Sequence, residues 1–122
     1  MRRRLAALAA AGLMLATADI AAAATPPLHS VGSVTRHAQQ YLNQQVALRG
    51  YLLAREGGYI LLSDEPAGKV SRYDLPVIGE GIDLMRTGQR YRVEGLFLDH
   101  GLVASNGSPV HLELSTPPTV VP

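Results

Sequence analysis

From residue 45 onward, hydrophobic residues recur at every second position in several runs, which is typical of strands with one buried face. The first two such runs are joined by the turn signal Glu56-Gly57-Gly58, so they form a predicted β-hairpin over 45–65. Pro76 lies in the third and weakest run, where it indicates an edge position or a strand end. The predicted strands cover residues 45–53, 59–65, 70–78, 89–99 and 110–115.

A helical spacing precedes these strands. The positions i, i+4, i+7 and i+8 place four apolar residues on one face of a helix: Val34, Ala38, Tyr41 and Leu42. We therefore predict a helix over 33–43, with Ser33 as its N-cap, that packs on the neighbouring sheet. About two further turns of helix fit between the glycines of 79–88.

Gly50 and Gly95 interrupt two of the best strands in matched surroundings, VALRGYLL and YRVEGLFL. Glycine weakens the interior of a strand, so each placement needs a reason. A sheet of so few strands must curl and close to hide its edges, and bulges and glycines provide the bends. We therefore interpret both glycines as corners of a small barrel, where a strand passes sharply between its two halves. The alternative is an incidental glycine in a half-exposed strand.

Several stretches resemble the OB-fold. VALRGYLL, GGYILLSDE and GKV are similar to its glycine-bearing first strand and to a second strand that ends in Leu-x-Asp before a glycine turn, and GQRYRVEGLF resembles its fourth strand. Within that fold, residues 44–115 resemble the small exported bacterial OB-fold proteins and the anticodon-binding-like type. The resemblance implies an all-β fold with small α content, a five-stranded OB-like barrel preceded by a short N-terminal helix. Two departures are that helix and Ser63, which stands where the family usually has a basic or aromatic residue.

The N-terminal segment has the features of a Sec-type signal peptide. Three arginines precede an apolar run of 12 residues, Leu5–Ala16, which is too short to span a bilayer. Ala22-Ala23-Ala24 provide the small residues for cleavage before Thr25, and a second candidate site follows Ala18. We therefore predict a periplasmic or secreted protein. Its predicted parts are the signal peptide 1–24, a lead-in 25–32, the OB-like domain 33–116 and a tail 117–122.

Charge and cysteine content narrow the function classes. Removal of residues 1–24 takes away three arginines and Asp19, so 11 basic and 10 acidic residues become 8 and 9, a net charge of −1 with neutral histidines. Non-specific nucleic-acid binding needs a basic excess, which is missing here. The chain has no cysteine, which excludes disulfides, thiol chemistry and a lipid anchor on cysteine.

No catalytic motif is present in the sequence, and we predict no enzymatic activity, no cofactor and no metal. His111 and Glu113 share a strand face and could give two metal ligands, but a third is missing, so a solvated face is the simpler prediction. Asp99 and His100 are adjacent, so in a strand they would point to opposite sides and could not form a base and its orienting partner, and in a turn Asp-His-Gly is ordinary turn composition. Asp64 is predicted to cap the turn that follows it.

The OB resemblance implies a ligand face on the second and third strands and their flanking loops. On it we expect Tyr59, Arg72 and Tyr73, together with Arg92 from the fourth strand, since tyrosine and arginine stack on bases, sugars and peptide groups. The alternative is that the tyrosines are barrel core with hydroxyls at the rim. We therefore expect a binding module for an envelope protein or an oligosaccharide. The other two hypotheses are a nucleic-acid-binding OB domain, which the charge disfavours, and a small hydrolase or metal-dependent enzyme.

Overall fold

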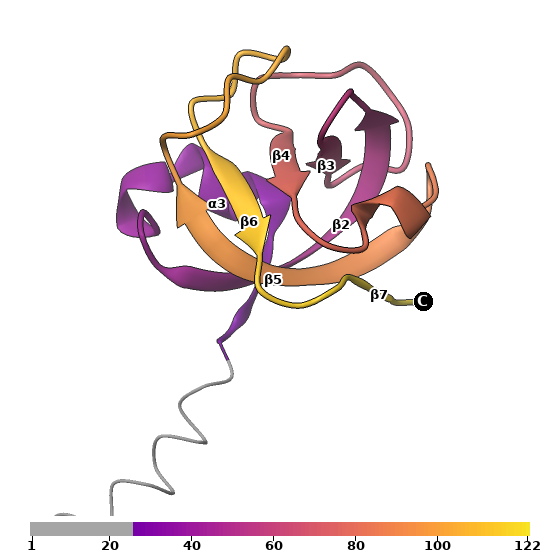
Figure 1. Cartoon of the computed structure of the whole chain (residues 1–122), viewed down its shortest axis with the longest axis horizontal. Coiled ribbons are helices and arrows are strands. Elements are labelled where there is room, and N and C mark those ends of the chain that lie inside the picture. The colour runs from indigo at the N-terminus through magenta and orange to yellow at the C-terminus, as the bar shows by residue number, and fades with distance from the viewer. Residues whose placement is uncertain (1–25) are drawn as a thin grey trace, which may run out of the picture.

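The computed structural model describes residues 26–122, so the signal peptide predicted at 1–24 lies outside the described residues. Five strands close a barrel in the order β2-β3-β4-β6-β5, and β5 pairs back with β2 (Figure 1). The β4–β6 pairing is parallel and the other four are antiparallel. The all-β fold class is thereby confirmed. The barrel strands are β2 (Gln45–Arg55), β3 (Ile60–Ser63), β4 (Leu75–Ile78), β5 (Arg90–Leu98) and β6 (His111–Leu114).

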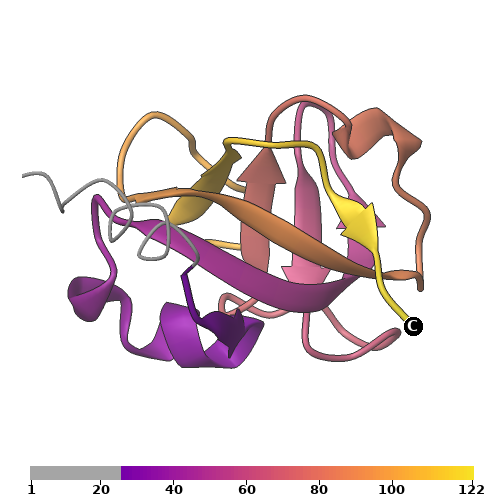
Figure 2. The same ribbon diagram turned by 90° about the horizontal axis from the view of Figure 1, so that it is seen from below.

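The long strand β2 belongs to both halves of the barrel. Its first part, Gln45–Tyr51, pairs with β5, and its last part, Tyr51–Arg55, pairs with β3. Figure 2 shows β2 and β5 side by side across the molecule. The register of β2 and β3 shifts between Leu52 and Ala54, which marks the bulge where β2 turns from one partner to the other.

Both ends of the described chain join the sheet. In the lead-in, β1 (Leu28–Ser30) pairs in parallel with Ala47–Arg49 of β2. In the tail, β7 (Thr119–Val120) pairs antiparallel with Tyr91 and Arg92 of β5. These short strands occupy parts of the edges of β2 and β5 that the barrel strands leave free, so the folded domain extends beyond 33–116 on either side.

The helix α3 is shorter than predicted and begins earlier. It covers Val31–Arg36, and its N-cap is Ser30, whose side chain accepts a hydrogen bond from the backbone amide of Ser33. The helix ends at His37, whose φ of −124° and ψ of 41° are not helical, and whose Nδ1 lies 3.0 Å from the Ser33 carbonyl oxygen that its own amide would use in a longer helix. A separate 3-10 turn follows at Ala38–Gln40. No helix among residues 26–122 is long and apolar enough to cross a membrane.

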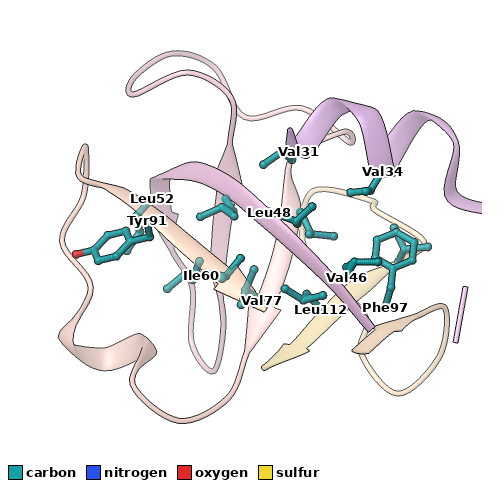
Figure 3. Packing of buried hydrophobic residues seen from close by; sticks show 14 of the residues in the cluster. Val31, Val34, Val46, Leu48, Leu52, Ile60, Val77, Tyr91, Phe97 and Leu112 are labelled. Carbon is teal, nitrogen blue, oxygen red and sulfur yellow. The ribbon is translucent and has the colours of Figure 1, made fainter. Parts of the chain in front are cut away.

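The apolar face predicted for this segment is nevertheless confirmed. Val34 is fully buried, and Ala38, Tyr41 and Leu42 pack against the core. Figure 3 shows Val31 and Val34 pointing from α3 into the barrel interior. The helix therefore adds side chains to the core.

The third strand is shorter than predicted. A tight turn precedes β4, because Asp74 Oδ2 accepts from the Ser71 amide and Ser71 Oγ accepts from the Tyr73 amide. Pro76 pairs with Leu61 of β3. On the opposite side of β4 the pairing with β6 begins only at Val77, so no residue of β6 needs a hydrogen bond from an N–H at position 76.

The segment between β4 and β5 forms less helix than expected. Only the 3-10 turn Ile82–Leu84 lies between the glycines of 79–88. Gly79 and Gly81 have φ of 134° and 98°, in the left-handed region that favours glycine and ends regular helix. The connector therefore acts as a turn.

The alternation predicted for the fourth strand is confirmed in β5. Tyr91, Val93 and Phe97 are buried in the core, whereas Arg90, Arg92 and Glu94 lie on the outer face. The hydroxyl of Tyr91 reaches the end of the core and accepts a hydrogen bond of 2.7 Å from the Arg86 amide.

Gly50 and Gly95 lie where other parts of the barrel come close to them. A Cβ at Gly50 would lie 2.8 Å from Val31 Cγ2 and 2.8 Å from Leu62 Cγ. A Cβ at Gly95 would lie 2.7 Å from the carbonyl carbon of Glu113 and 2.8 Å from Leu114 Cα. The bulge of β2 lies after Gly50, between Leu52 and Ala54. Both positions therefore need glycine because neighbouring chain segments come too close to leave room for a Cβ.

Candidate functional site

A polar pocket of about 350 Å³ lies between α3 and the loop 64–74 that joins β3 to β4. Arg36 of α3 and Asp64, Lys69 and Tyr73 of the loop are among the residues that line it. The pocket exists because β3 ends at Ser63 and the chain makes a long excursion before β4 begins.

Asp64 ties this loop to the helix. Its Oδ1 accepts from the Val31 amide at 2.8 Å and its Oδ2 accepts from the Gly32 amide at 2.9 Å. These amides belong to the first turn of the helix, where backbone N–H groups have no acceptor within the helix. The prediction that Asp64 caps the following turn is therefore wrong: Ser63 Oγ accepts from the Glu65 amide in that turn, and Asp64 bonds to α3 instead.

Two arginines surround the Tyr73 ring at the pocket. The guanidinium carbon of Arg36 lies 4.4 Å from the ring centroid and that of Arg72 lies 5.7 Å from it. Such contacts contribute about 0.5–1 kcal/mol at exposed sites. These contacts hold guanidinium groups beside the pocket, where their N–H groups can donate to the carboxylates, carbonyls or hydroxyls of a ligand. The sequence indicated Arg72 and Tyr73, but the third member is on the polar face of a helix distant in the chain.

The other two predicted ligand-binding residues lie elsewhere. The Tyr59 hydroxyl accepts from the Ser105 amide at 2.7 Å, in the contact between the β2–β3 turn and the β5–β6 loop. Arg92 Nη1 donates to Glu94 Oε1 at 3.2 Å on the outer face of β5. Neither residue lines the pocket, so the structure brings together Arg72 and Tyr73 but leaves Tyr59 and Arg92 apart from them.

Asn106 fixes the loop that carries Tyr73. Its side-chain amide donates to the carbonyl oxygens of Ser71 and Asp74, each at 2.9 Å. The β5–β6 loop thereby holds the turn before β4 in place. The sequence marks Asn106 only as the centre of a loop, because its partners are remote in the chain.

His111 is buried, which corrects the prediction of a solvated strand face. Only 2% of it is exposed, and its Nε2 has no hydrogen-bond partner among residues 26–122. Glu113 Oε2 lies 3.8 Å from Nε2. Burial lowers the pKa of His111, and the charge of Glu113 opposes this shift in part.

Asp99 and His100 lie in a turn, which is the second of the two settings expected for them. They face each other, with 3.3 Å between Asp99 Oδ1 and His100 Nδ1, because they lie in the turn after β5 rather than in a strand. Both side chains are exposed. Within the described range 26–122, no three His, Cys, Asp or Glu side chains are placed to hold a metal ion.

The buried histidine predicts a pH dependence of stability. Its pKa is lowered from 6.5 in the folded protein, so the unfolded chain binds more protons as pH falls through 6.5. The free energy of unfolding should therefore fall as the pH is lowered from about 7.5 to about 5.5, as measured by urea denaturation. His111→Gln should flatten this slope, and His100→Gln, at an exposed histidine, should retain it. Equal slopes in wild type and His111→Gln would contradict the expectation.

Comparison with known proteins gives structural likeness only. No protein-family model matches the chain, and no curated protein matches its sequence. Among solved structures, an OBody bound to hen egg-white lysozyme is similar with a TM-score of 0.53 and 15% identity, over 76% of this chain and 92% of that one. The fold is an OB-like barrel. This barrel also resembles a DUF3299 family protein from Pseudomonas aeruginosa, with a TM-score of 0.53 and 10% identity, over 80% of this chain and 97% of that one.

A third similar structure is a putative aspartyl-tRNA synthetase from Leishmania major. Its TM-score is 0.54 at 15% identity, over 80% of this chain. This chain covers only 21% of the synthetase. At these identities the three likenesses concern the barrel alone.

Proposed function

We propose that this protein is an exported binding module that recognises a segment of an envelope protein in the pocket between α3 and the loop 64–74. The observation that carries the proposal is a set of free charges of both signs at one pocket. Within residues 26–122, no ion pair engages Arg36, Lys69 or Glu65. A polypeptide offers acceptors, donors and charges of both signs, and so fits this lining.

The remaining polar groups of the pocket are used for structure. Asp64 and Asp74 accept hydrogen bonds from backbone amides, which leaves the free charged side chains to contact a ligand. The similar OBody is described as bound to hen egg-white lysozyme, so a barrel of this shape serves as a protein binder in that case. That likeness supports a protein as the class of partner, but it does not identify which protein.

Nucleic acid is the rival ligand, suggested by the synthetase among the similar structures. Base stacking needs an open aromatic face, but the guanidinium of Arg36 lies over the Tyr73 ring. The net charge of −1 after residue 24 also provides little attraction for phosphates. An oligosaccharide, whose hydroxyls the same donors could bind, is the other alternative that the test must distinguish.

Site-specific photocrosslinking tests the pocket directly. A photoreactive phenylalanine analogue at Val70, an exposed residue of the pocket loop, should capture one discrete envelope protein in cells, and Arg36→Ala should remove that product. The same analogue at Leu84, which is 81% exposed and lines a different surface, is the matched control. The same product from both positions would refute the site. Binding of single-stranded oligonucleotides or of purified envelope oligosaccharides by the wild type, lost in Arg36→Ala, would replace the protein partner.

Export is a separate part of the proposal. It follows from the arginines and the apolar run of residues 1–24, and it predicts a mature protein that begins at Thr25. Fractionation of cells followed by N-terminal sequencing measures this. Recovery of the uncleaved chain from the cytoplasm would refute export without affecting the pocket.

A further inference from the structure

The outer face of β2 and β5 carries a second, basic surface away from the Tyr73 ring. Arg49 of β2 lies directly opposite Arg92 of β5, and Tyr51 lies directly opposite Arg90. Residues opposite each other in an antiparallel pair share a face, and like charges there are destabilising. Three arginines thus occupy one small area of the sheet.

The acidic groups nearby already have partners. Glu94 is paired with Arg92 at 3.2 Å. Both carboxylate oxygens of Asp64 accept hydrogen bonds from the first amides of α3. Arg49 makes no ion pair or side-chain hydrogen bond with any residue from 26 to 122.

Arg49 and Arg90 line a shallow hollow. It has a volume of about 70 Å³ and lies where β1 ends and β3 has not yet begun to pair with β2. Arg90 is held over the Tyr51 ring with its guanidinium carbon 5.8 Å from the centroid, and it uses only Nη1 to donate to the Pro122 carbonyl oxygen at 3.3 Å. A guanidinium has five N–H donors, so most of those of Arg90 remain for a ligand. The hollow is lined by Ser30, Arg49, Gly50, Tyr51, Asp64 and Arg90.

We propose that Arg49 and Arg90 form a binding site for a single phosphate group. Two guanidinium groups at one hollow can donate several charge-assisted hydrogen bonds to the oxygens of a phosphate. A bound phosphate would also compensate the charge of Arg49, which has no ion-pair partner among residues 26–122. This site uses neither Arg36 nor Tyr73, and the residue that it shares with the protein-binding pocket is Asp64, which holds α3.

Titration with inorganic phosphate at constant ionic strength, followed by amide NMR shifts, tests the site. We expect saturable shifts at Ser30, Gly50 and Tyr51, and binding about tenfold weaker in Arg49→Gln. Arg86→Gln removes the same charge from an exposed arginine that does not line the hollow, and it should bind like wild type. Equal weakening in both variants, or the same shifts with sodium chloride alone, would overturn the proposal.

Two further measurements define the source of the phosphate and guard against a folding defect. Binding of glycerol 3-phosphate would indicate a soluble phosphate ester, and binding of vesicles of phosphatidylglycerol with phosphatidylcholine would indicate a lipid headgroup. In either case, binding that is lost in Arg49→Gln supports the site. Arg49→Gln should fold about as stably as wild type, because Arg49 makes no ion pair or side-chain hydrogen bond within residues 26–122. Retention of the Val70 crosslink in Arg49→Gln would show that the two sites act separately, and a destabilised Arg49→Gln protein would overturn the assignment of Arg49 to a ligand.

Discussion

Gly95→Ala should lower the free energy of unfolding by at least about 3 kcal/mol, because the new Cβ has no space. It would lie 2.7 Å from the carbonyl carbon of Glu113 and 2.8 Å from Leu114 Cα. These are backbone atoms of β6, which cannot turn aside as a side chain can. Gly95 pairs with Val46 on one side and with Leu114 on the other, so a shift away from one neighbour disturbs the other.

Urea denaturation followed by circular dichroism measures this effect. Gly57→Ala is the matched control, since no atom lies within 4 Å of the position that its new methyl group would take and its φ is not in the left-handed region. It should change stability by less than about 0.5 kcal/mol. If Gly95→Ala were as stable as Gly57→Ala, the close crossing of β5 and β6 would be refuted.

Gly50→Val should lower the free energy of unfolding by about 2–3 kcal/mol, despite the preference of valine for strands. The Cβ would lie 2.8 Å from Val31 Cγ2 and 2.8 Å from Leu62 Cγ, both in fully buried side chains. The expected cost is smaller than at Gly95 because these neighbours are side chains. A valine as stable as glycine here would contradict the close approach of Val31 and Leu62 to this position.

A double-mutant cycle isolates the steric contact at Gly50. Val31→Ala shortens one of the two neighbours, so the double variant Gly50→Val with Val31→Ala should be less destabilised than the sum of the single variants. Gly50→Val with Val110→Ala is the control pair, because Val110 is a core residue outside the close neighbours of Gly50. Strict additivity in the first pair would place the cause of destabilisation elsewhere.

Much of the strand layout could be predicted because its signals are local. Alternation with a period of two follows from strand geometry, and it identified the buried face of β5 residue by residue. The β2–β3 hairpin follows from its turn residues. The ends of α3 and β4 were misplaced because side chains such as those of His37 and Asp74 bond to nearby backbone and stop the regular structure.

The candidate site was predicted only in part. Arg72 and Tyr73 are adjacent in the chain, so their proximity needed no fold. Arg36 reaches the same ring, and Asp64 reaches the amides of α3, only because the loop after β3 folds against the start of the helix. Tyr59 and Arg92 were grouped with them on the OB resemblance, but they contact Ser105 and Glu94 instead.

The strand pattern, its buried faces and the unusual placement of Gly50 and Gly95 can be read from the sequence, since each depends on the local repeat of residue types. The local sequence does not show what lies against each glycine, that His111 is buried, or that Arg36, Asp64 and Tyr73 meet at one pocket. Those outcomes depend on which segments remote in sequence are brought into contact. Barrel closure makes that choice through the packing of the whole core.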